Sequence, residues 1–166
     1  MFRTIDDFVA SWAWESEQTG KVLANLTDAA LEQRAEAEGR TLGSIAWHLV
    51  TTMPEMLGHA GLALMGPGPD VPAPASVRAI AHEYGRLSLS VPGCVRARWS
   101  DEVLGETIPM YGQAWQRRQV LSSLVLHQVH HRGQMTVLMR LAGLRVPGIY
   151  GPSREEWIAM GHTPMA

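Results

Sequence analysis

Apolar residues recur at helical spacing over several stretches of the chain. In residues 5–26 they lie mostly three or four positions apart, at Ile5, Phe8, Val9, Trp12, Val22, Leu23 and Leu26. This spacing gathers them on one face of an α-helix, whereas a half-buried strand would alternate apolar and polar residues. Residues 31–40, which follow, are charged and alanine-rich, and predict either a short helical turn or a loop.

A second helix is predicted to begin after Thr41, a residue type that favours the N-cap position. Its apolar face consists of Leu42, Ile45, Leu49 and Met56, and Pro54 within it predicts a kink or an irregular turn. Residues 66–74, GPGPDVPAP, form a linker because their glycines and prolines suit neither helix nor strand.

A third helix is predicted from the apolar positions that follow the linker, which are Val77, Ile80, Ala81, Tyr84, Leu87 and Val91. The VPG sequence at 91–93 predicts the end of this helix. Between residues 95 and 112, the stretches 95–99 and 106–111 predict two short extended segments that cross the end of a bundle.

The fourth predicted helix is the longest, spanning about residues 115–142 and ending at Gly143. Its core stripe is predicted to be Val120, Leu124, His127, His131, Gln134, Leu138 and Leu141. Further on, Ser153 and Glu156 have the spacing of a capping box, which predicts a short C-terminal helix.

The predicted fold class is therefore all-α, a four-helix bundle within one domain of residues 1–166. A net charge of −2 gives no electrostatic footprint for nucleic acid. No apolar run approaches the ~20 residues of a membrane span. The N-terminal residues lack the pattern of a signal peptide, and Cys94 is the only cysteine, so we expect a cytoplasmic protein.

The segment 126–134, LHQVHHRGQ, places imidazoles in the apolar stripe of the fourth helix. His127 and His131 are four positions apart and lie about 40° apart on one face, whereas His130 lies about 100° around the helix from His131. Burying an unpaired polar group costs about 2 kcal/mol or more. A divalent metal would satisfy both stripe histidines, and hydrogen bonding within the core is the alternative.

A catalytic metal site usually has three protein ligands and an open position, so a third ligand should come from another helix. His48 is the best candidate because it lies one turn beyond Ile45, close to the core face of the second helix. His59, His82 and His162 follow it in that order.

Other residues near these histidines could assist them. Gln134 could orient a ligand or bind a histidine nitrogen. Arg132 could bind a substrate carboxylate, although an ion pair with an acid on a neighbouring helix or subunit is favoured. His130 is expected at a helix or dimer contact or beside a ligand. Glu55 and Glu83 could face the site, but structural or solvated roles are favoured for both.

Three stretches resemble the DinB/YfiT-like superfamily: HQVHHRGQMTVLMRLAG, RTLGSIAWHLV at residues 40–50, and VPGIYGPSREEW. The resemblance implies a four-helix bundle, often homodimeric, with one divalent metal on three histidines, which are here His48, His127 and His131. It also implies relatives that are metal-dependent S-transferases or isomerases using bacillithiol, mycothiol or glutathione, and others that are described as hydrolases.

Three functions are compatible with this reading. The leading one is a thiol S-transferase, with a small-molecule thiol and an electrophile as partners. The second is a hydrolase that uses metal-bound hydroxide. The third is a metal-binding sensor or interaction module, which predicts a saturated ion with no pocket. Imidazole ligands do not define the metal; zinc or nickel is expected first, then manganese or iron.

Overall fold

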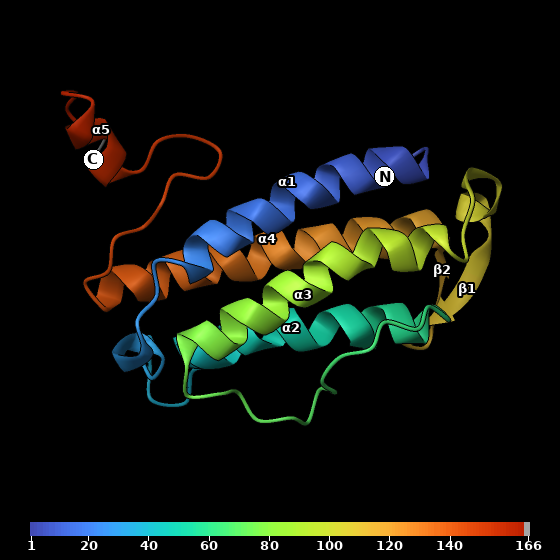
Figure 1. The fold of residues 1–166 in the computed structure, drawn as a ribbon, viewed down its shortest axis with the longest axis horizontal. Coiled ribbons are helices and arrows are strands. Elements are labelled where there is room, and N and C mark those ends of the chain that lie inside the picture. Colours follow the sequence, from blue (N-terminus) through green and yellow to red (C-terminus); the bar gives the residue numbers. More distant parts are fainter. Residues whose placement is uncertain (165–166) are drawn as a thin grey trace.

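Four long helices make up about half of the chain (Figure 1), as expected for the predicted helical bundle. The computed structural model describes residues 1–164, so the last two residues of the predicted domain lie outside the described part. The long helices are α1 (Ile5–Leu23), α2 (Leu42–His59), α3 (Val77–Arg96) and α4 (Arg117–Leu141). The shorter elements are η1 (Asp28–Ala30), η2 (Asp101–Gly105), β1 (Thr107–Met110), β2 (Gln113–Gln116) and α5 (Arg154–Ala159).

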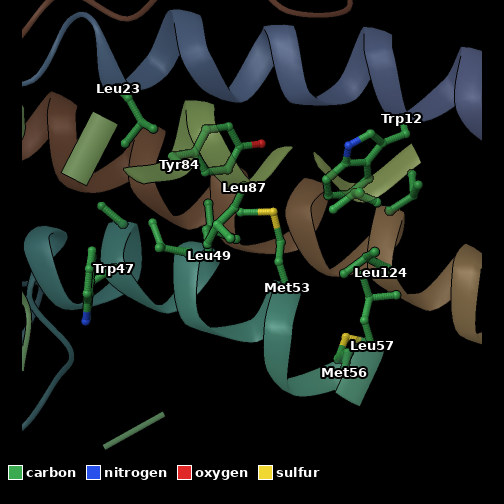
Figure 2. Packing of buried hydrophobic residues seen from close by; sticks show 14 of the residues in the cluster. Trp12, Leu23, Trp47, Leu49, Met53, Met56, Leu57, Tyr84, Leu87 and Leu124 are labelled. Carbon is green, nitrogen blue, oxygen red and sulfur yellow. The ribbon is translucent and has the colours of Figure 1, made fainter. Parts of the chain in front are cut away.

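The long helices pack around one shared apolar interior. α1 and α2 each pack mainly against α3 and α4, so α1 and α2 lie diagonally across the bundle. Figure 2 shows side chains from all four helices meeting in this core, among them Trp12, Met53, Tyr84 and Leu124. The helical spacing of apolar residues is therefore satisfied by burial on every long helix.

The order of helix directions explains the proline-rich linker. α2 and α3 run in the same direction, so residues 60–76 must return along the length of the bundle (Figure 1). The indole of Trp47 holds this crossover by donating a hydrogen bond from Nε1 to the carbonyl oxygen of Val71, at 2.7 Å. At its end, the backbone N–H of Val77 donates to a carboxylate oxygen of Asp28.

The predicted end of the third helix at residues 91–93 is wrong. α3 continues through Pro92 to Arg96. Proline cannot supply the N–H that would bond the carbonyl of Ser88, four residues earlier. The indole Nε1 of Trp12 on α1 donates to that carbonyl at 2.9 Å, so the acceptor has a partner and the helix can continue.

The extended segment near 95–112 is present but differs in detail. Residues 95–96 belong to α3, so the extended stretch at 95–99 is wrong. The second stretch corresponds to β1, which pairs in antiparallel fashion with β2, a strand that the sequence analysis assigned partly to the fourth helix. Tyr111 and Gly112 form the turn, both with positive φ, 51° and 76°. This combination is typical of a two-residue hairpin turn.

The other helix ends agree with the sequence patterns. The Thr41 side chain caps α2, and α2 continues through Pro54. Ser153 and Glu156 form the predicted capping box of α5, which stands apart from the bundle on the C-terminal segment (Figure 1). Two residues of the predicted core stripe, Gln134 and Leu141, are exposed, Leu141 to 56%. No helix within residues 1–164 is long and apolar enough to cross a membrane.

Candidate metal centre

Three histidines meet between α2 and α4. His127 and His131 lie one turn apart on α4, and their Nε2 atoms are 3.1 Å from each other. His48 approaches from α2, with its ring centroid 4.9 Å from that of His127 and 4.7 Å from that of His131. One ligand nitrogen from each side chain lies within 4.8 Å of the other two.

A buried amide holds the two helices in register beside the histidines. Gln128 is fully buried, and its Nε2 donates to the carbonyl oxygen of Leu49 on α2. Its Oε1 accepts a hydrogen bond from the Tyr84 hydroxyl on α3. Gln128 was not predicted as a core residue, because only apolar residues, the two histidines and Gln134 were placed on the buried stripe of the fourth helix. Its position four residues after the buried Leu124 is the signal that would have located it.

Gln134 fixes the orientation of one imidazole. Its Oε1 lies 2.6 Å from Nδ1 of His131, and a carbonyl oxygen can only accept a hydrogen bond. Nδ1 of His131 therefore carries the proton, which leaves the lone pair on Nε2 facing His127. Hydrogen bonds of this kind set the tautomer of metal-binding histidines in general.

Burial keeps these imidazoles neutral near pH 7. It is the largest cause that lowers the pKa of His48 and of His127, each to about 4, and the neighbouring His131 lowers both further. The pKa of His131 is also lowered, mainly by burial, although its hydrogen bond to Gln134 acts in the opposite direction. Neutral imidazole is the form that binds metal ions.

The arrangement fits a divalent transition-metal ion. Nitrogens bonded to zinc at about 2.0–2.1 Å lie roughly 3.0–3.4 Å apart, close to the separation between His127 and His131. Among residues 1–164, Nδ1 of His127 is buried without a hydrogen-bond partner, and the other ring nitrogen, Nε2, is the one that faces His131. Three imidazoles suit zinc, nickel, copper or iron.

Two cavities reach the histidine group from different ends of the α2–α4 interface. The first, of about 410 Å³, is bordered by His131 and by the loop before α2. The second, of about 420 Å³, is bordered by His48 and His127 and by the hairpin. We call them the loop cavity and the hairpin cavity. The three histidines therefore border space that a small molecule could enter.

The family model that describes the DinB family matches residues 1–163. The chain belongs to the DinB family. This DinB chain is 44% identical over 161 residues to the Bacillus subtilis protein YrdA, a match that covers 97% of the chain and 96% of YrdA.

Solved structures of DinB-like proteins have the same fold. The DinB chain is 41% identical to one from Bacillus cereus, with a TM-score of 0.86 over 90% of this chain and 100% of that one. It is 14% identical to the DinB-like protein YjoA of Bacillus subtilis, with a TM-score of 0.66 over 89% and 99% of the two chains, which shows a shared fold alone. The predicted family and fold are thus confirmed.

Arg132 of this DinB chain points away from the histidine group. It is 2% exposed and forms the favoured ion pair with an acid on a neighbouring helix, 2.5 Å from Oε2 of Glu15 on α1. It also donates to the Thr19 hydroxyl and to the Tyr150 hydroxyl. These partners occupy the guanidinium, so Arg132 has no free edge for a substrate carboxylate.

The remaining histidines lie outside the group. His130 is exposed, with its ring centroid 4.9 Å from that of His131. His59 lies 3.2 Å from a carboxylate oxygen of Glu55, and His162 packs against Trp157. His82 is exposed on α3.

The structure also reveals residues near the site that sequence reasoning did not single out. Arg40 borders the loop cavity, and Tyr111 borders the hairpin cavity. The Tyr111 hydroxyl donates to the Glu55 carboxylate, 3.0 and 2.9 Å from its two oxygens. Glu55, which the sequence indicated as a residue that could face the site, borders the hairpin cavity.

Proposed function

We propose that this DinB-family protein binds one divalent transition-metal ion on His48, His127 and His131 and transfers a low-molecular-weight thiol to an electrophile. The observation that carries the proposal is the convergence of three neutral imidazoles that border two cavities. Zinc and nickel are the first candidates for the ion because both bind imidazole well.

The residues of the chain would hold the ion in place and leave space for the thiol to reach it. The three histidines would hold the ion, and no other His, Cys, Asp or Glu of residues 1–164 joins their group. A divalent ion held there would supply the positive charge that lowers the pKa of a thiol and favours the thiolate near neutral pH. The sulfur then bonds to the electrophilic carbon, the leaving group departs with its electron pair, and the thiol proton passes to solvent.

The cavities support an enzyme over a sensor or interaction module. A saturated structural site needs no path to the ion, whereas a catalytic site keeps an open position facing a cleft. His48 and His127 border the hairpin cavity, and His131 borders the loop cavity. Space on both sides allows a thiol and an electrophile to approach together.

The test is conjugation by the metal-loaded protein. Bacillithiol, mycothiol and glutathione are each incubated with a model electrophile and with zinc- or nickel-loaded protein. Conjugation by the wild type but not by His127→Ala supports the proposal. His130→Ala is the matched control, because its imidazole belongs to the same segment but lies outside the group. Metal-dependent hydrolysis of the electrophile without conjugation would replace thiol transfer with the hydrolase function.

A homodimer and a cytoplasmic location belong to the same proposal. Leu126, Val137 and Leu141 are exposed on one face of α4, and Ile158 of α5 and Met160 just after it are also exposed. A second copy of the chain could cover such apolar surface. Light scattering after gel filtration tests the dimer; a mass near 18.2 kDa would contradict it. The cytosol keeps thiols reduced, which the transfer reaction requires.

A further inference from the structure

The two cavities beside the histidines differ in charge. They share none of their lining residues. Arg40 and Glu36, both exposed, are the charged residues of the loop cavity. In the hairpin cavity the acid is Glu55, which already accepts the Tyr111 hydroxyl and lies 3.2 Å from His59. The remaining walls of the hairpin cavity include Met56, Pro69 and Trp115, which suit an apolar group.

The loop that carries Arg40 and Glu36 is anchored. The N–H groups of Leu42 and Gly43, at the start of α2, donate to the carbonyl oxygens of Gln33 and Leu31 before the loop, each at 2.8 Å. Within the loop, the N–H of Gly39 donates to the carbonyl of Glu36 at 3.0 Å, which closes a tight turn. This turn brings residues 36 and 40 to the same cavity.

Both charges are available to a ligand. Within residues 1–164, neither the Arg40 guanidinium nor the Glu36 carboxylate has an ion-pair partner, and they do not pair with each other. Arg40 also lies near enough to lower the pKa values of His48, His127 and His131 by charge repulsion. A ligand that reaches the histidines through this cavity would therefore meet a cation and an anion at its far end.

We propose that the loop cavity binds the charged end of a thiol that carries both a carboxylate and an ammonium group. The carboxylate pairs with Arg40, which can bind it through two parallel hydrogen bonds, and the ammonium pairs with Glu36. The apolar electrophile enters through the hairpin cavity. This assignment rests on the proposed function, and it names the thiol class and the side from which each reactant enters.

The experiment measures thiol binding to the zinc-loaded protein by titration calorimetry. Four probes separate the charges: glutathione has both groups, 3-mercaptopropionate only a carboxylate, cysteamine only an ammonium, and 2-mercaptoethanol neither. Arg40→Gln should weaken glutathione and 3-mercaptopropionate about tenfold, as expected for the loss of a charged hydrogen-bond pair. It should change cysteamine and 2-mercaptoethanol by less than about twofold.

Glu36→Gln should give the complementary pattern, weakening glutathione and cysteamine while leaving 3-mercaptopropionate no weaker. Arg78→Gln, which removes an exposed arginine at the start of α3 outside both cavities, is the control and should change none of the four. Equal binding of all four probes to the wild type would overturn the assignment. So would an Arg40→Gln variant that binds glutathione and 3-mercaptopropionate as tightly as the wild type does.

The outcome is separable from that of the proposed function. The expected binding pattern without conjugation would refute thiol transfer and leave the loop cavity as a thiol-binding site. Metal-dependent conjugation in which Arg40→Gln leaves the KM for glutathione unchanged would keep the transferase and refute the assignment of the cavity.

Discussion

Among single residues, Arg132 is a charged side chain that is buried in the bundle and depends on its ion pair there. Its guanidinium is buried against Glu15 on α1 and also contacts Tyr150 in the C-terminal segment. Removing one partner of a buried ion pair leaves the other charge without compensation, which costs about 3–5 kcal/mol. Arg132→Leu should therefore lower the free energy of unfolding by about that amount, measured by urea denaturation.

Tyr150→Phe is the matched control for this change. It keeps the aromatic ring, which lies against the Arg132 guanidinium, and removes only the hydroxyl that contacts Glu15 and Arg132. The expected loss is about 1 kcal/mol. Equal stability of Arg132→Leu and the wild type would show that the pair contributes nothing net.

Residue spacing predicted the histidine group but not its surroundings. His127 and His131 share a helix face by arithmetic, and His48 was the most core-facing histidine of the second helix. Arg40 and Tyr111 reach the cavities only because a loop and a hairpin turn fold toward α2 and α4. Such contacts depend on tertiary packing, which no local pattern encodes.

At the scale of elements, the contact between α1 and α3 explains why α3 continues through a proline. Trp12→Phe removes the indole N–H and leaves the Ser88 carbonyl without its partner. The loss of this hydrogen bond should lower the free energy of unfolding by about 1–3 kcal/mol. Pro92→Ala restores a backbone N–H four residues after Ser88. The loss caused by Trp12→Phe should therefore be smaller in the Pro92→Ala background, by about 1 kcal/mol in a double-mutant cycle.

Pro54→Ala provides the control for this cycle because Pro54 lies inside α2, away from the bonded Trp12–Ser88 pair. Trp12→Phe and Pro54→Ala should be additive. Additivity of Trp12→Phe with Pro92→Ala as well would contradict the explanation of why α3 continues.

The elements themselves were largely predictable. Long apolar periodicities located α1, α2 and α4, and Ser153 located α5. The wrong predictions concern segments whose structure depends on a residue far away in the sequence. Trp12 bonds the carbonyl that Pro92 leaves free and so permits α3 to continue, and β2 forms because β1 pairs with it. Strands of four residues are too short to show alternation.

For the whole molecule, a bound ion should stabilise the fold, because the histidines come from two helices that must pack together to bind it. Free zinc at a concentration 100 times its Kd should raise the free energy of unfolding by about 2.7 kcal/mol. Thermal unfolding with and without zinc measures this effect. His48→Ala should show little stabilisation, and His130→Ala should respond like the wild type. An equal zinc response of His48→Ala and the wild type would exclude His48 as a ligand.

Metal content is the measurement that tests the three-histidine site most directly. Elemental analysis is made on purified wild type and on His127→Ala, each after purification and after reconstitution with zinc, nickel or manganese, with protein concentration determined independently. We predict about one ion per chain in the wild type and little in the variant. No bound metal in either protein after reconstitution would show that His48, His127 and His131 serve packing and hydrogen bonding only.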